Sequence, residues 1–186
     1  MFFFLLAGGY AVYRLVLAGQ ESIPEEFENA RAQGAFVAQS IVGLAGDLSG
    51  ELQTVRFLDS ERKYEEALTI VTHLAEKNEE MRTKAVELSQ ELEKMTIALA
   101  SIQSFEAREA ALDGIGNRLA LISRLIAYND EMVKLLNALR LRFAGGGASG
   151  EDVGPIIARI NNEVAAINDF NAKAATAMDR FDKLVR

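Results

Sequence analysis

The fold is decided by residues 64–99, which read YEEALTIVTHLAEKNEEMRTKAVELSQELEKMTIAL. Apolar or neutral residues recur about every seven positions on two neighbouring lines, and charged residues fill the positions between them. One line holds Tyr64, Val71, Asn78, Ala85, Leu92 and Leu99; the other holds Leu68, Leu74, Met81, Leu88, Met95 and Ile102. This spacing is typical of a long helix with one buried face.

Three other stretches carry the same pattern, each with a first and a second line. The first lines are Phe27, Gly34, Ile41, Leu48 and Val55; Phe105, Leu112, Leu119, Ile126 and Val133; and Val153, Ile160, Ile167, Ala174 and Phe181. The second lines are Ala30, Val37, Leu44 and Leu58; Ile115, Ile122, Asn129, Leu136 and Phe143; and Ile157, Val164, Asn171, Met178 and Val185. The sequence therefore predicts helices over 23–58, 60–102, 105–143 and 152–186, with a Gly-rich loop over 144–151. We expect an all-α fold, an antiparallel up-down four-helix bundle of long coiled-coil-like helices, as the bundle domain 21–186.

Two points about these helices stay open at this stage. The junction near residue 59 lacks glycine and proline, so residues 23–103 could instead form one bent helix. Gly34, Gly43, Gly46 and Gly50 weaken the first helix by up to ~1 kcal/mol each. We expect close helix–helix approach to compensate for them.

Residues 1–20 form a separate hydrophobic unit that precedes the bundle. Residues 2–18 contain one charged residue, Arg14, and at about 1.5 Å per residue they span roughly 26 Å, close to the hydrocarbon thickness of a bilayer. The predicted anchor residues are Phe2, Phe3, Phe4, Leu5, Leu6, Tyr10, Tyr13 and Arg14. Tyr10 and Tyr13 suit the headgroup level, and the long stem of Arg14 can reach the interface.

We therefore expect a single-pass membrane protein that contacts the lipid bilayer through residues 2–18. Glu21, Glu25 and Glu26 follow this segment without an early basic cluster, so the positive-inside rule favours an extracytoplasmic bundle. A cleaved signal peptide and a buried helix of a soluble bundle are the alternatives for these residues.

The composition argues against several function classes. The chain has 20 basic and 27 acidic residues, a net charge of −7, so we expect no nucleic-acid partner. It has no cysteine and a single histidine, His73, which lies off the apolar lines and should be on the surface. We therefore expect no catalytic residue, no metal and no cofactor.

The candidate site is a set of polar residues on or beside the apolar lines. Ser40, Asn78, Asn129 and Asn171 fall at similar heights when the helices are folded antiparallel. Their first interpretation is a buried polar layer that fixes helix register at some cost in stability. The second is a small-ligand site between the helices.

These features predict a non-enzymatic, membrane-anchored scaffold or adaptor that contacts itself or another helical protein. The alternatives are an extracytoplasmic ligand-binding sensory bundle and a soluble coiled-coil assembly protein. In outline, an anchor followed by a four-helix bundle resembles the sensor domains of bacterial chemoreceptors. Those receptors have a second membrane span and a signalling region, which this sequence does not show, so we do not expect it to signal alone.

Overall fold

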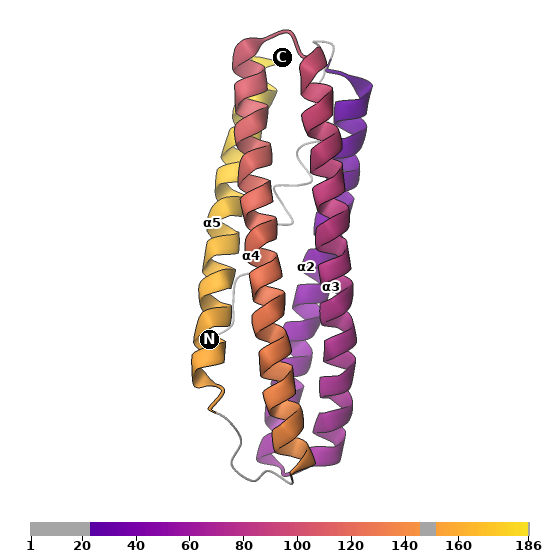
Figure 1. Ribbon diagram of the computed structural model, residues 1–186, viewed down its shortest axis with the longest axis vertical. Coiled ribbons are helices and arrows are strands. Elements are labelled where there is room, and N and C mark those ends of the chain that lie inside the picture. Colours follow the sequence, from indigo (N-terminus) through magenta and orange to yellow (C-terminus); the bar gives the residue numbers. More distant parts are fainter. Residues whose placement is uncertain (1–22, 146–151, 186) are drawn as a thin grey trace.

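A computed structural model of the chain describes residues 23–145 and 152–185. These residues form α2 (Glu25–Ser60), α3 (Tyr64–Ala98), the short 3-10 helix η2 (Leu99–Ser101), α4 (Phe105–Ala144) and α5 (Gly154–Leu184). Consecutive α-helices run in opposite directions along one long axis (Figure 1). The predicted all-α bundle is thus confirmed for the described residues.

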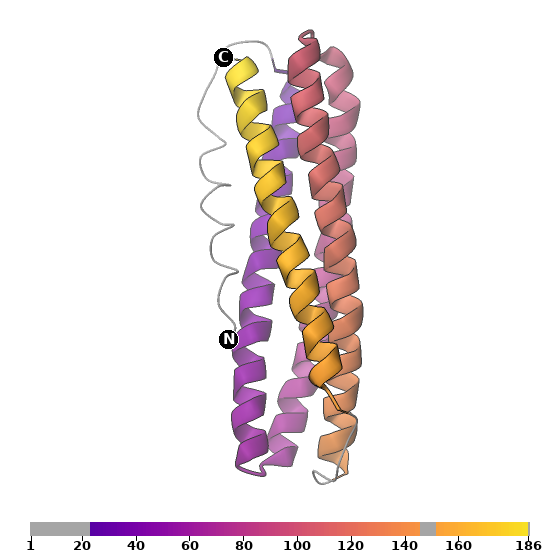
Figure 2. The same cartoon turned by 90° about the vertical axis from the view of Figure 1, so that its left-hand side faces the viewer.

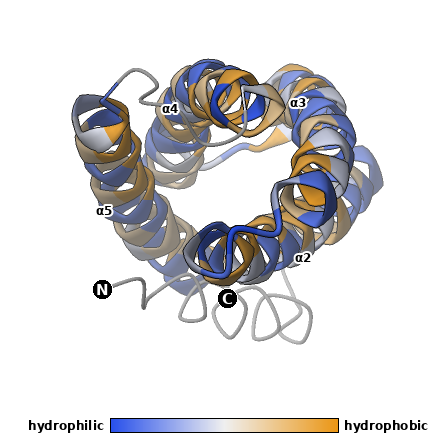
Figure 3. Cartoon of the chain, turned by 90° about the horizontal axis from the view of Figure 1, so that it is seen from below, coloured by the Kyte–Doolittle hydropathy of each residue, from blue (hydrophilic) through white to orange (hydrophobic). Residues whose placement is uncertain are grey.

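The four helices surround a common centre in the order α2, α3, α4, α5 (Figure 3). Each helix packs closely against the next one in sequence, whereas the backbones of α2 and α5 make little contact. Figure 2 shows α5 crossing the bundle at a slant instead of lying parallel to α2. Within residues 23–145 and 152–185, the bundle therefore has three packed seams and one open seam, between α2 and α5.

Most predicted lines face the interior. Phe27, Leu48, Leu74, Met81 and Leu92 are among the fully buried side chains. The line that begins at Phe105 differs: it lies on the outside of α4, and the buried line of that helix contains Ile115, Ile122, Asn129 and Leu136.

The glycines of α2 behave differently from one another. A Cβ built on Gly34 would lie 3.5 Å from the Glu91 Cβ, so this glycine does face α3 closely. Gly43, Gly46 and Gly50 have no atom within 4 Å of such a Cβ, and the close approach expected there is wrong. The tightest approach is at Gly114 of α4, where a Cβ would lie 2.6 Å from the Met178 Sδ of α5.

The α2–α3 turn excludes a single bent helix over residues 23–103. Arg62 adopts φ 58°, in the left-handed region. The Arg62 N–H donates to the Asp59 carbonyl at 3.1 Å, and the Lys63 N–H donates to the Leu58 carbonyl at 2.9 Å. These two bonds are those of a Schellman motif, which ends a helix and reverses the chain.

Replacing Arg62 with glycine should stabilise the bundle. Left-handed backbone costs an L residue with a Cβ roughly 1–2 kcal/mol, and glycine avoids that cost, although it gains entropy in the unfolded chain. We expect Arg62→Gly to raise the free energy of unfolding by about 0.5–1 kcal/mol in urea denaturation followed by circular dichroism. Arg62→Ala, which keeps the Cβ, is the control and should change little. A Gly variant less stable than the Ala variant would contradict this account.

The other two connections also rest on local hydrogen bonds. The Ser104 hydroxyl caps α4 by accepting from the Ala107 N–H at 3.2 Å. The Asp152 Oδ1 accepts from the Gly154 N–H at 2.9 Å, and Pro155 stands in the first turn of α5. Side-chain oxygens and an early proline satisfy or remove the unpaired N–H groups of a helix start.

Candidate functional site

Two of the four predicted polar-layer residues meet in the core. Asn78 of α3 and Asn129 of α4 are both buried, and the Asn78 Nδ2 donates to the Asn129 backbone carbonyl at 3.2 Å. The Asn78 Oδ1 and both amide atoms of Asn129 have no hydrogen-bond partner among the described residues. The pair therefore joins α3 to α4 by one hydrogen bond, and three of its buried polar atoms have no partner in the described part of the chain.

The other two predicted residues lie apart from this pair. Ser40 is half-buried, and its hydroxyl donates to the Phe36 carbonyl one turn earlier in the same helix, at 3.2 Å. Asn171 is half-buried on α5 and borders a cleft between the helices. The structure thus brings together a pair of asparagines, not a layer that includes all four helices.

Asn129 offers a direct test of the cost of this pair. Its side chain is 1% exposed and makes no hydrogen bond to a described residue, whereas an apolar group of similar size needs none. We expect Asn129→Leu to raise the free energy of unfolding by about 1–2 kcal/mol, with a higher melting temperature. Asn137→Leu, at an exposed position of the same helix, is the control. A lower melting temperature for Asn129→Leu would show that the amide stabilises the fold.

A cleft of about 140 Å³ opens at the middle of the bundle, along the α2–α5 seam. All four helices line it, with Val42 and Ala45 from α2, Leu88 from α3, Leu125 from α4 and Ile167 from α5. The polar side chains on its wall are Gln39, Tyr128, Asn168 and Asn171, and no charged side chain lines it. We call it the mid-bundle cleft. Its wall is suited to a neutral, largely apolar molecule.

Tyr128 is the most enclosed polar residue of the mid-bundle cleft. It is 7% exposed, and its hydroxyl makes no hydrogen bond to a described residue. Burial raises the pKa of the Tyr128 hydroxyl to about 12, because the phenolate would lose its hydration. Tyr128 is therefore a neutral hydrogen-bonding group in an apolar wall at physiological pH.

A buried ion pair closes one end of the α2–α5 seam. Arg31 of α2 is 5% exposed, and its two terminal nitrogens donate to the two carboxylate oxygens of Asp182 in α5 at 2.8 and 2.7 Å. The Phe27 and Phe181 rings pack beside it with centroids 5.2 Å apart. Burial, together with the nearby Arg31 charge, lowers the pKa of Arg118 to about 10, and Asp182 acts in the opposite direction. The Asp182 carboxylate therefore offsets the positive charges of both Arg31 and Arg118.

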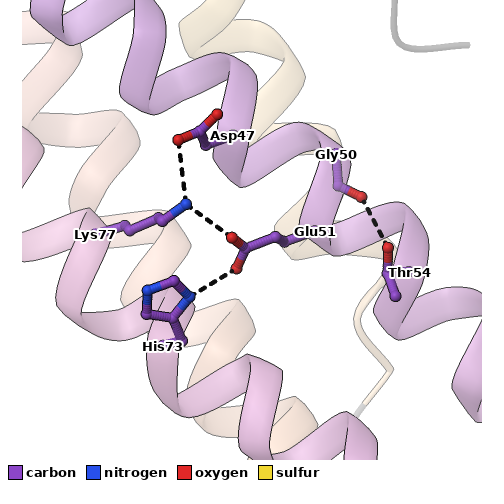
Figure 4. A network of polar contacts seen from close by, with 6 residues as sticks. All are labelled: Asp47, Gly50, Glu51, Thr54, His73 and Lys77. Atoms are coloured by element: carbon purple, nitrogen blue, oxygen red, sulfur yellow. Dashed lines mark hydrogen bonds and ion pairs between the residues drawn. The ribbon is translucent and has the colours of Figure 1, made fainter.

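A second polar network joins α2 to α3 on the surface (Figure 4). The Lys77 Nζ donates to Glu51 at 2.7 Å and to Asp47 at 3.1 Å, and the His73 Nδ1 lies 3.2 Å from the second oxygen of Glu51. Hydrogen bonding to Glu51, and then to Asp47, raises the pKa of Lys77. His73 is exposed, as its place off the apolar lines predicts. The arrangement is that of a solvated helix–helix ion-pair network.

The outer surface of α4 carries the apolar line that sequence analysis assigned to the core. We call Phe105, Leu112, Leu119, Ile126 and Val133 the outer apolar line. Phe105, Leu112, Leu119 and Val133 are between 43% and 67% exposed, and Ile126 is half-buried against the core. Gly116 lies between Leu112 and Leu119, with open space beside it. No described part of the chain covers this line.

Sequence reasoning did not identify Tyr128 or the Arg31–Asp182 pair. The signal for Arg31 was its position, four residues after Phe27 and three before Gly34, on the buried face of α2. The signal for Tyr128 was its place directly before the buried Asn129. A position within one helix does not show which residue of another helix the side chain will contact.

No group of three or more His, Asp or Glu side chains in residues 23–145 and 152–185 could hold a metal ion. Likewise, none of the described helices has an apolar stretch long enough to span a membrane. The predicted anchor residues, Phe2 to Arg14, lie outside the described ranges.

Comparison with protein families, with curated proteins and with solved structures finds no match to this chain.

Proposed function

We propose that this chain is a non-enzymatic helical scaffold, anchored to a membrane by residues 1–20, that works through helix–helix contacts with a second copy of itself. The outer apolar line of α4 is the observation that supports this proposal. Four large side chains of this line are about half exposed, and their apolar surface is removed from water only when another helix covers it.

The geometry of the outer apolar line suits a helical partner. Its residues are seven apart, which is the spacing at which two helices wound around each other stay in contact. Gly116 has no atom within 4 Å of a Cβ built on it, so a partner backbone could approach closely there.

The charges along α4 favour a second copy in the antiparallel orientation. Up to residue 113, the exposed charged residues of α4 are Glu106, Glu109 and Asp113, all acidic. From residue 124 onward they are Arg124, Asp130, Lys134 and Arg140, of which three are basic. Antiparallel pairing of two α4 helices would place the acidic start of each beside the mainly basic end of the other, which favours this orientation over the parallel one.

The self-association is tested by light scattering on the purified full-length chain and on Leu112→Glu/Leu119→Glu. The native chain should have the mass of a dimer, and the double variant that of a monomer with an unchanged helical circular-dichroism spectrum. Leu141→Glu is the matched control, because Leu141 is an exposed leucine of the same helix outside the line. A monomeric native chain, or a double variant that remains dimeric, would overturn the proposal.

The anchor is tested by fractionating cells that express the full-length chain. An anchored chain should stay in the membrane fraction after an alkaline wash and should dissolve in detergent. Recovery in buffer without detergent would reject the anchor in favour of a soluble coiled-coil assembly protein. The start of α2 and the end of α5 lie at the same end of the bundle, so an anchor would hold the Arg31–Asp182 end next to the membrane (Figure 1).

A further inference from the structure

The mid-bundle cleft has the properties of a small-molecule site. Its volume of about 140 Å³ is close to the ~150 Å³ of an engineered apolar cavity that binds benzene. It lies where α5 slants away from α2, and the described helices leave it open along this seam. These dimensions suit a single ring and not a long chain or a fused-ring cofactor.

The lining of the cleft restricts the charge of the ligand. Apolar side chains such as Val42, Leu88 and Ile167 form most of its wall, and no lysine, arginine, aspartate or glutamate lines it. An ion that entered would lose hydration without gaining a counter-charge, which is strongly unfavourable. The ligand is therefore neutral.

Tyr128 is the second observation that points to a ligand. Tyr128 is only 7% exposed as a residue, yet its hydroxyl oxygen is not fully enclosed, so a ligand in the cleft can reach it. It lines the cleft and has no hydrogen bond to a described residue. Its hydroxyl stays protonated at neutral pH, so it can donate to a ligand oxygen. The amide of Asn171 borders the same space from α5.

We propose that the mid-bundle cleft binds a neutral, single-ring compound that carries one hydroxyl group, and that this group hydrogen-bonds with the Tyr128 hydroxyl. This site is distinct from the outer apolar line of α4. The chain would thus bind a small molecule between its first and last helices in addition to contacting another helix.

The probes are phenol, toluene and benzoate, which share a ring but differ in polar group and charge. Each is titrated by NMR against the full-length chain and against Ala45→Phe, in which the new ring occupies the cleft. If the full-length chain is kept in lipid or detergent, each probe also dissolves in that phase. This loss of free probe is the same for both chains, so it does not affect the comparison of their affinities. Phenol should bind the native chain with a dissociation constant on the order of 0.1–1 mM. Its dissociation constant for Ala45→Phe should be at least tenfold larger. Benzoate should not bind.

The role of the hydroxyl is tested with Tyr128→Phe, which keeps the ring. Phenol should bind this variant about five- to tenfold more weakly, because one hydrogen bond is lost, whereas toluene affinity should not change. Chemical-shift changes at Leu125 and Val164 on adding phenol to the native chain locate the site even where Ala45→Phe fails to fold. The proposal is overturned by equal phenol affinity in the native and Tyr128→Phe chains, by shifts away from the cleft, or by benzoate binding as well as phenol.

Discussion

Replacing Asp182 with asparagine is expected to destabilise the bundle by roughly 2–4 kcal/mol, the largest effect of any single substitution considered for this chain. The change keeps the shape of the side chain but removes the negative charge that accepts from both Arg31 nitrogens. Arg31 then keeps only Glu28 as a counter-charge, a 43% exposed side chain whose Oε1 lies 3.6 Å from the Arg31 Nη1. Arg118 also loses its favourable interaction with the Asp182 charge. The measurement is the free energy of unfolding from urea denaturation.

Two further variants separate this electrostatic cost from a general effect on α5. Asp179→Asn changes an exposed aspartate of the same helix and should alter stability by less than about 0.5 kcal/mol. Arg31→Met, added to Asp182→Asn, removes the buried guanidinium that has lost its two hydrogen bonds to Asp182 and should restore most of the lost stability. Equal stabilities for Asp182→Asn and Asp179→Asn would show that the ion pair contributes nothing measurable.

The second large effect is a loss of stability at alkaline pH that depends on Tyr128. Its pKa is about 12 in the folded chain, against about 10 for an unfolded tyrosine, so between these values the unfolded chain releases a proton that the folded chain keeps. The contribution of Tyr128 to stability is therefore fully present below pH 10 and is lost as the pH rises towards 12. Two pKa units correspond to about 2–3 kcal/mol.

The measurement is the difference in free energy of unfolding between the native chain and Tyr128→Phe, followed from pH 9 to pH 12. The difference cancels every other group that titrates in this range, Arg118 included. The absorbance of tyrosinate, followed against pH, should show one tyrosine that ionises near pH 12 in the native chain. This step should be missing in Tyr128→Phe. Ionisation of Tyr128 near pH 10 in the folded chain would contradict its enclosure.

The helices could be predicted from the sequence because the seven-residue period is a local property. The same period could not decide which apolar line of α4 is buried, since the Phe105 line and the Ile115 line both repeat correctly. The outcome depends on where α3 and α5 lie, which is a tertiary property. Nor could the α2–α3 turn be located from composition, because Arg62 holds the left-handed position usually taken by glycine.

The sequence could predict the level of the candidate site along the bundle axis, but not which of its side chains contact one another. Antiparallel folding places Asn78, Asn129 and Asn171 at one level, and the structure has the asparagine pair and the mid-bundle cleft in that region. Asn171 lies on the wall of the mid-bundle cleft instead of joining the pair. Its place depends on how α5 packs against α4, including the contact of Met178 with Gly114, which no single-helix pattern contains.

The unpacked glycines of α2 bear on how a molecule could reach the bundle interior. Gly43, Gly46 and Gly50 weaken one stretch of α2 without any compensating contact in the described chain, whereas α3 contains no glycine. Amide hydrogens around residues 43–50 should therefore exchange with solvent through brief local opening, faster than those in the middle of α3. This stretch adjoins Val42 and Ala45, so its local opening would widen the entrance to the cleft along the α2–α5 seam, while the three packed seams remain closed.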